Sequence, residues 1–305
     1  MFFQKPPLSR GADVFYPAAP SWFFCRIMLY LLQREGGGAL KIRILCLLLT
    51  TFLLAGCGPV PAPTEPPDTL PESLYTPEDF AMNGDYLTCT AGSAAVGIDV
   101  SSHQGKIDWQ KVADAGVEFA FVRLGYRGYE SGVLQNDVFV DLNLRGARDA
   151  GIAVGAYFFS QAVTVEEAKE EAQFALRILG DFSLDLPLVY DWEYVSETAR
   201  TAGVDKATLT ACTVAFCEAV ETAGYRPMVY FNSAQVKMLD MQQLQKYPWW
   251  LAKYDTAQEF PCRVDLWQYT NQGAVPGISG NVDMDLMFTD YGLGAEVFAN
   301  EKGRG

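Results

Sequence analysis

The sequence has one histidine among its 305 residues, His103, and this scarcity excludes several kinds of active site. A Ser-His-Asp triad would have to use His103, and no G-x-S-x-G nucleophile elbow is present. A zinc site with two or three histidine ligands is impossible. The sequence also lacks an EF-hand loop and a phosphate-binding glycine-rich loop. Hydrolysis by paired carboxylates is not excluded in this way.

Positive charge is also scarce, because 23 Lys and Arg residues stand against 37 Asp and Glu residues, for a net charge of −14. The first 57 residues carry six of the basic groups and only two acids, so the rest of the chain is still more acidic. Binding to nucleic acid or to anionic lipid headgroups needs a basic surface. We therefore expect no nucleic-acid partner and no electrostatic docking onto a membrane.

Long hydrophobic runs are absent as well. The apolar run at residues 44–55 is shorter than the ~20 residues of a membrane-spanning helix. It follows Lys41 and Arg43 and ends in Leu-Ala-Gly-Cys57, which together resemble a lipoprotein signal peptide with its lipobox. The resemblance implies cleavage before Cys57 and a diacylglycerol on its thiol. We therefore expect a protein held by this lipid on the outer side of a bacterial cell membrane, in the cell-wall space.

The segments around this signal peptide suggest a domain organisation. Residues 1–39 fit poorly in front of a signal peptide, and we interpret them as a doubtful extension, with translation beginning at Leu40. Residues 58–93 are a proline-rich tether and a lead-in, and residues 292–305 are a C-terminal tail. Residues 94–291 remain as one domain, since no internal repeat is visible.

Strand and helix signals alternate through this domain, which favours a parallel sheet. Five strands are each followed by a helix, and three further strands follow with short gaps and no helical period. Eight strands can close a barrel, so we predict an α/β fold, an irregular TIM-like (β/α)5(β)3 barrel. An open doubly wound sheet is the alternative, but it would leave the last three strands without covering helices. The predicted strands are 96–100, 119–124, 153–159, 188–190, 227–231, 249–253, 264–269 and 282–288, and the predicted helices are 108–115, 136–150, 164–179, 205–223 and 233–245.

The fourth strand carries the most informative pair of residues. An apolar run from Leu186 ends in Asp191 and Glu193, which are two residues apart. On a strand this spacing puts both side chains on one face, with Cα atoms roughly 6.5 Å apart. Burying two acids is costly unless they have a task, and paired carboxylates cleave glycosidic bonds. The alternative is that one of them caps the next helix.

Further acids and aromatic residues fall at the strand ends where a barrel places its active site. Asp99 lies near the end of the first strand, and Asp283 and Asp285 lie on the eighth, which neighbours the first in a closed barrel. Crowded carboxylates raise one another's pKa, so one of them can act as an acid near neutral pH. Aromatic rings there suit sugar faces, although packing in the barrel core is the alternative. A Mg²⁺ or Ca²⁺ site is the other interpretation of the acids.

The ordered set of motifs resembles the family-25 glycoside hydrolases, the lysozymes that act as N-acetylmuramidases. The motifs that carry the resemblance are residues 97–105 (GIDVSSHQG), 108–109 (DW), 121–125 (FVRLG), 155–157 (GAY), 190–193 (YDWE), 267–269 (WQY) and 280–283 (GNVD). The resemblance implies an irregular barrel of five βα units and three strands. It also implies cleavage of the β-1,4 bond from N-acetylmuramic acid to N-acetylglucosamine in peptidoglycan, without a metal or cofactor.

The same resemblance implies roles for individual residues. Glu193 corresponds to the general acid/base, and Asp191 to the carboxylate that stabilises the reacting centre, directly or through the substrate's acetamido group. Asp99 and Asp283 correspond to supporting acids. Where the family often has a histidine, this chain has Phe158, which puts one polar sugar contact in doubt. We expect substrate contacts from Tyr157, Tyr230, Trp267 and Gln268.

The sequence therefore predicts a monomeric lipoprotein that hydrolyses peptidoglycan. Two alternatives remain: a barrel that binds cell-wall glycan without cutting it, and a glycosidase for another polysaccharide. The cysteines decide nothing further, since Cys212 and Cys217 read as small core residues and a bridge from Cys89 to Cys262 stays open.

Overall fold

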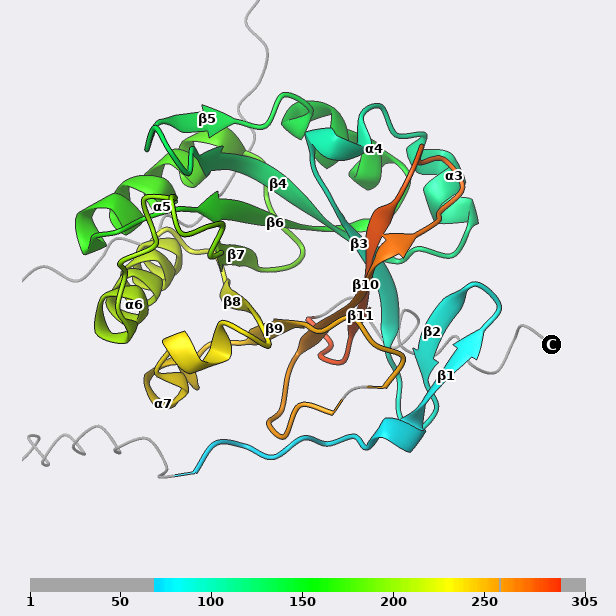
Figure 1. Ribbon diagram of the computed structural model, residues 1–305. Helices are drawn as coiled ribbons and strands as arrows, with labels where there is room; N and C mark the ends of the chain where they lie inside the picture. The colour runs from blue at the N-terminus through cyan, green and yellow to red at the C-terminus, as the bar shows by residue number, and fades with distance from the viewer. Residues whose placement is uncertain (1–68, 258, 292–305) are drawn as a thin grey trace, which may run out of the picture. The chain divides into compact units, whose positions relative to one another are not determined.

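The computed structural model describes residues 69–257 and 259–291, which form a closed β-barrel with helices on its outside (Figure 1). The predicted N-terminal extension, signal peptide, lipidated Cys57 and C-terminal tail lie outside the described residues. Eight strands make up the barrel, and they pair in the order β3-β4-β6-β7-β8-β9-β10-β11, with β11 returning to β3. The predicted fold class is therefore confirmed.

The strands of the barrel run parallel except for the last one. β11 is antiparallel to both of its neighbours, β10 and β3, and so it closes the sheet. This irregularity follows from the short connection between β10 and β11, which leaves no room for a crossover helix. The barrel strands are β3 (Ala95–Val100), β4 (Phe119–Arg127), β6 (Ala153–Ser160), β7 (Leu188–Trp192), β8 (Pro227–Asn232), β9 (Trp249–Ala252), β10 (Leu266–Gly273) and β11 (Val282–Met287).

Helices follow the first five barrel strands, as predicted. Side-chain caps start several of them: Asp108, Thr164 and Asp205 each accept a hydrogen bond from a backbone N–H three residues later. Glycines with positive φ follow the ends of these helices, where the chain must turn back to the sheet. The helices are α3 (Trp109–Asp114), α4 (Val140–Asp149), α5 (Val165–Leu179), α6 (Lys206–Thr222) and α7 (Met241–Leu244), with 3-10 turns η2 (Ser102–Gln104) and η3 (Val236–Met238).

Two predicted helices differ from the structure. The helix predicted over 136–150 begins at Val140, because residues before it form β5 (Leu134–Asn136), which pairs with an extended β4. The helix predicted over 233–245 is broken into η3 and α7. Leu239 between them has extended backbone, and Asp240 then caps a new helix by accepting from the N–H groups of Gln242 and Gln243.

The hydrophobic core has two layers, one inside the barrel and one between the barrel and the helices. Successive side chains along each strand point alternately into one layer and the other. On β4, Phe119 and Phe121 point into the barrel, whereas Ala120 and Val122 point outward into the layer beneath the helices. The barrel interior is so full that a Cβ on Gly97 would lie 2.2 Å from the Phe119 ring. Large side chains therefore fill the lower barrel.

A hairpin before the barrel packs onto it and was not anticipated. β1 (Phe80–Asn83) and β2 (Tyr86–Cys89) pair antiparallel after the 3-10 turn η1 (Pro77–Asp79). The Phe80 ring meets the Trp267 indole edge to face, with centroids 5.1 Å apart, and Leu87 is fully buried. The segment 69–93, which was expected to be a lead-in, therefore contributes Phe80, Leu87 and Cys89 to the hydrophobic core. The four described cysteines form no disulfide bond.

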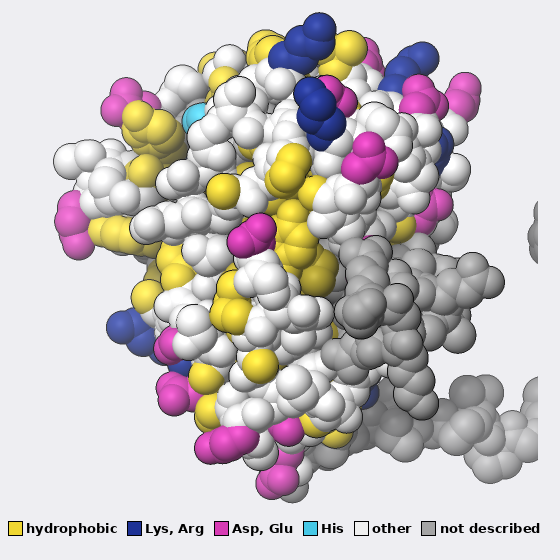
Figure 2. Space-filling model, turned by 90° about the vertical axis from the view of Figure 1, so that its right-hand side faces the viewer, with side chains coloured by type: hydrophobic (Ala, Val, Ile, Leu, Met, Phe, Trp, Pro, Cys, Tyr) yellow, Lys and Arg dark blue, Asp and Glu magenta, His cyan; other side chains and the backbone are white. Residues whose placement is uncertain are grey.

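The surface mixes charged and apolar side chains. On the face drawn in Figure 2, charged side chains are scattered around a band of hydrophobic ones near the middle. None of the helices in the described part of the chain combines the length and the apolar character that crossing a membrane requires. Among the large hydrophobic side chains, Tyr254 is one of those that remain exposed, at 54%.

Candidate active site

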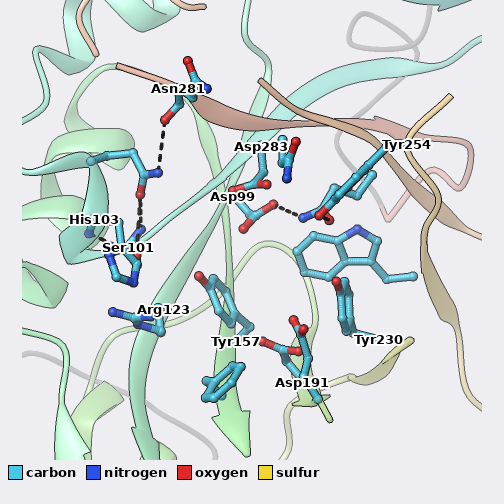
Figure 3. Close-up of a pocket in the computed structure, with 16 residues that line it drawn as sticks. Asp99, Ser101, His103, Arg123, Tyr157, Asp191, Tyr230, Tyr254, Asn281 and Asp283 are labelled. Atoms are coloured by element: carbon cyan, nitrogen blue, oxygen red, sulfur yellow. Dashed lines mark hydrogen bonds between the residues drawn. The ribbon is translucent and has the colours of Figure 1, made fainter. Parts of the chain in front are cut away.

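A cleft of about 370 Å³ opens at the carboxyl ends of the barrel strands (Figure 3). This volume lies within the usual range for small-molecule sites. The side chains that line it come from most of the barrel strands and from the loops after them. They are Asp99, Ser101, His103, Gln104, Arg123, Tyr157, Phe159, Asp191, Glu193, Tyr230, Trp250, Tyr254, Gln268, Asn271, Asn281 and Asp283.

Asp191 and Glu193 meet at the end of β7. Each carboxyl group is close enough to shift the pKa of the other, and the Tyr230 side chain from β8 lies close enough to Glu193 to lower its pKa. The backbone here is fixed by two buried amides: Gln161 Nε2 donates to the Glu193 carbonyl at 2.7 Å, and Gln235 Nε2 donates to the Trp192 carbonyl at 3.0 Å. The alternative that one acid only caps a helix is not supported, since α6 begins thirteen residues after Glu193 and is capped by Asp205.

Asp99 and Asp283 lie side by side because β3 and β11 pair them directly in register. Gln268 Nε2 donates to Asp99 Oδ2 at 2.6 Å, and the Tyr254 hydroxyl donates to Gln268 Oε1 at 3.2 Å. Gln268 therefore orients a carboxylate, besides lining the cleft. Asp285 lies two residues after Asp283 on β11. It is fully buried, and its Oδ1 accepts a hydrogen bond from Trp250 Nε1 at 2.9 Å.

Burial raises the pKa of every carboxyl group in this cluster. The pKa of Asp99 lies well above its ordinary value because of burial and the nearby charges of Asp283 and Asp285. Burial raises the pKa of Asp283 to about 6. These shifts disfavour the charged forms, so the cleft does not hold a full negative charge on each acid near neutral pH.

The catalytic pair itself shows the same direction of shift. Burial and the neighbouring Glu193 carboxylate hold the pKa of Asp191 well above its ordinary value, although Arg123 lowers it in part. Burial, and to a smaller extent Asp283, raises the pKa of Glu193 against the hydrogen bonds from Tyr230 and Asp191. A carboxyl group that keeps its proton near neutral pH is what a general acid requires.

The structure brings together seven of the eight side chains that the sequence analysis proposed for catalysis and binding, and Trp267 is the exception. Its indole is fully buried in the outer layer of the core, and its Nε1 donates to the Lys253 carbonyl at 2.8 Å. The alternation on β10 explains this placement, because Gln268 points into the barrel and its neighbour must point out. We therefore remove Trp267 from the candidate site. Phe158 likewise packs in the outer layer.

Several cleft residues were not singled out from the sequence, among them Arg123, Trp250 and Tyr254. Trp250 forms the floor of the site, with ring centroids 5.2 Å from Tyr230 and 6.3 Å from Tyr157. The signal for Arg123 was available, since it continues the inward alternation of Phe119 and Phe121 on the same strand.

The acids do not form a metal site in this arrangement. Within residues 69–257 and 259–291, no group of three or more His, Cys, Asp and Glu side chains could hold a metal ion. Protein donors already engage Asp99 and Asp285, through Gln268 and Trp250 respectively.

Comparison with known proteins identifies similar chains. Residues 98–278 match the glycosyl hydrolases family 25. Lysozyme M1 of Streptomyces globisporus is 28% identical over 205 residues, which cover 63% of this chain and 67% of that protein. The uncharacterized protein YegX of Escherichia coli K12 is 30% identical over 201 residues, covering 62% and 68%. The autolysin LytC of Streptococcus pneumoniae, solved with a synthetic peptidoglycan ligand, is 29% identical with a TM-score of 0.57, covering 64% of this chain and 47% of that one.

Proposed function

Since the chain belongs to glycosyl hydrolases family 25 and is therefore a glycosidase, we propose that it hydrolyses peptidoglycan at the β-1,4 bond from N-acetylmuramic acid to N-acetylglucosamine. The observation that carries the proposal is the buried carboxyl pair Asp191 and Glu193, placed at the strand ends in a cleft large enough for sugar rings. The similar lysozyme and autolysin chains support the substrate. This chain spans about half the length of the pneumococcal autolysin.

Glu193 acts as the general acid in this proposal. Its pKa is raised by burial, which favours the protonated form that the glycosidic oxygen needs, and the Tyr230 side chain lies beside it. The Gln161 amide holds the backbone at the same point. After the bond breaks, the carboxylate of Glu193 takes the proton from the water that completes hydrolysis.

Asp191 stabilises the positive charge that develops at the sugar's anomeric carbon, directly or by orienting the substrate's acetamido group. Its Oδ1 is buried and accepts no hydrogen bond from the described residues.

Asp99 and Asp283 act as supporting acids on the opposite strands of the cleft. Their proximity raises the pKa of Asp99, and Gln268 fixes the orientation of its carboxyl group. Tyr157 and Tyr230 contribute ring faces and hydroxyl groups to sugar binding, since both line the cleft with little exposure. Gln268 contributes chiefly by orienting Asp99.

The predicted place of action follows from the sequence before the barrel. We propose that Cys57 carries a lipid that anchors the protein to the outer side of the cell membrane, next to the peptidoglycan. The acidic barrel gives no electrostatic attraction to anionic lipid, so the lipid would provide the attachment.

A glycan-binding module without catalysis is the rival function. Purified protein and its Glu193→Gln form are incubated with insoluble peptidoglycan, and soluble fragments and bound protein are measured separately. The proposal expects fragments from the wild type and none from the variant, while both forms co-sediment with the wall. Co-sedimentation without fragments from the wild type would establish the binding module instead.

A further inference from the structure

Arg123 is the one lysine or arginine among the described residues that line the cleft. It projects from β4 on the same face as Phe119 and Phe121, above the packed barrel interior. Strand pairing places it directly beside Tyr157 of β6. A cation therefore stands next to the tyrosine that we expect to contact sugar, in a cleft whose other charged groups are mostly acids.

The guanidinium group is held rigidly on one side and left open on the other. Nε donates to Asp137 Oδ2 at 2.9 Å, and Nη2 lies 2.8 Å from the same oxygen. Nη2 also donates to the Ser102 hydroxyl at 3.0 Å. Within the described part of the chain, Nη1 donates no hydrogen bond. The Arg123 side chain is 12% exposed, so it remains accessible from the cleft.

Asp137 does not depend on Arg123 alone for its hydrogen bonds. Its side chain is fully buried, and it also accepts from the backbone N–H groups of Ser102 and Phe139. Asp137 therefore holds the Arg123 guanidinium group in a fixed position. A preorganised guanidinium loses little side-chain entropy when it binds a ligand.

The wall around Arg123 is rich in hydrogen-bond donors. Figure 3 shows Arg123, Ser101, His103 and Asn281 on one side of the cleft, across from the acids Asp99, Asp191 and Asp283. A neutral sugar can bind anywhere in such a cleft. An anionic group is repelled by the acidic wall and favoured at this donor wall, so its position would be fixed.

We propose that Arg123 binds a carboxylate carried by the muramyl residue of the substrate, so that it selects muramic acid over glucosamine beside Tyr157. This rests on the proposed function, because that function supplies the glycan. A muramyl residue offers carboxylates from two sources: its own lactyl group in peptide-free strands, and the stem peptide where the lactyl group is amidated. Both present the planar oxygens that match a guanidinium edge.

The test measures binding, so that it does not depend on cleavage. Glu193→Gln protein is titrated calorimetrically with peptide-free glycan strands and with the same strands after reduction of the carboxyl groups to alcohols. The proposal expects at least tenfold weaker binding to the reduced strands, since bonds to a charged group are worth about 1.5–3 kcal/mol. A third titration uses peptide-bearing strands. Arg123-dependent binding of the peptide-free strands indicates the lactyl carboxylate, and Arg123-dependent binding of the peptide-bearing strands indicates a stem-peptide carboxylate.

The matched variant adds Arg123→Gln with Asp137→Asn, which removes both buried charges and avoids an unpaired Asp137. Thermal unfolding checks that it folds. The double variant should bind native and reduced strands equally, with the affinity that the parent has for reduced strands. Arg123→Lys should keep part of the preference for native strands, because the positive charge remains although the paired N–H donors of the guanidinium are lost. Two results would overturn the proposal: equal binding of native and reduced strands by the parent, with no Arg123-dependent binding of peptide-bearing strands, or a preference that persists in the double variant. Failure of cleavage at the muramic acid bond would contradict only the proposed function.

Discussion

At the scale of single residues, the site depends on carboxyl groups whose protons are held by burial. Glu193 and Asp191 lie close enough to shift each other's pKa, and Asp99 and Asp283 face each other across two paired strands. None of these interactions can be predicted from a single residue type. They arise because the strand ends bring acids from β3, β7 and β11 to one place.

Glu193→Gln should reduce kcat at least about a thousandfold while leaving substrate binding nearly unchanged, because the amide keeps the size of the side chain but cannot supply a proton. Steady-state kinetics on soluble glycan strands measure both effects. Glu197→Gln is the matched control, since this glutamate is exposed four residues later and does not line the cleft. Comparable losses in the two variants would argue against the assigned role.

Asp283→Asn should stabilise the protein at neutral pH. The folded pKa of about 6 exceeds the ordinary value of 3.8, so the folded protein binds the proton more tightly and its stability falls as pH rises through this window. The amide removes that cost, and we expect about 2 kcal/mol more free energy of unfolding at pH 7.5 and little gain at pH 3.5. Urea unfolding at both pH values measures this.

The control for that change is Asp181→Asn, on an exposed carboxylate before β7, at the other end of the strand from the cleft. It should alter the free energy of unfolding by no more than a few tenths of a kcal/mol at either pH. A stability gain for Asp283→Asn that is independent of pH would show that its origin is not the shifted pKa.

At the scale of elements, the β1–β2 hairpin shows how side chains outside the barrel complete its core. Phe80→Ala should lower the free energy of unfolding by about 3–4 kcal/mol, because the ring is buried against Trp267 and Phe288. Met82→Ala on the same strand is the control, since Met82 is 56% exposed. Urea denaturation that found equal effects for the two variants would mean that the hairpin is not part of the core.

The elements also show what the sequence could and could not predict. Alternation and capping residues located the barrel strands and four of the helices, because those signals are local. The hairpin was missed although Gly84, with φ of 64°, stands at the first central position of a two-residue turn that favours glycine. The short strands around it offered little alternation, and their pairing with the barrel depends on contacts distant in sequence.

The sequence likewise predicted some residues of the candidate site and not others. The acids were identified because carboxylates in apolar sequence are unusual. The assignment of Trp267 was wrong because its orientation depends on one step of the strand register, which exchanges inside and outside. Arg123 was overlooked although it lies in the motif 121–125 and continues the inward alternation of Phe119 and Phe121. Its role depends on the acids and the tyrosine around it, which only the structure brings together.

At the scale of the whole molecule, the chain couples a proposed lipid anchor to a barrel whose active cleft lies within residues 94–291. Cys57→Ser should move the protein from the membrane fraction to the soluble fraction of the producing cells, because the thiol is the proposed attachment point. Activity of the purified variant on peptidoglycan should equal that of the wild type. Fractionation and an activity assay check both, and unchanged membrane association would contradict the anchor.

The central claim is that the cleft cuts on the reducing side of muramic acid by means of Glu193. Its most direct test digests purified peptidoglycan with the wild type and with Glu193→Gln, and identifies the reducing ends of the released fragments by mass spectrometry after borohydride reduction. The account predicts reduced muramic acid ends from the wild type and no fragments from the variant. Reduced glucosamine ends, or equal release by both proteins, would contradict it.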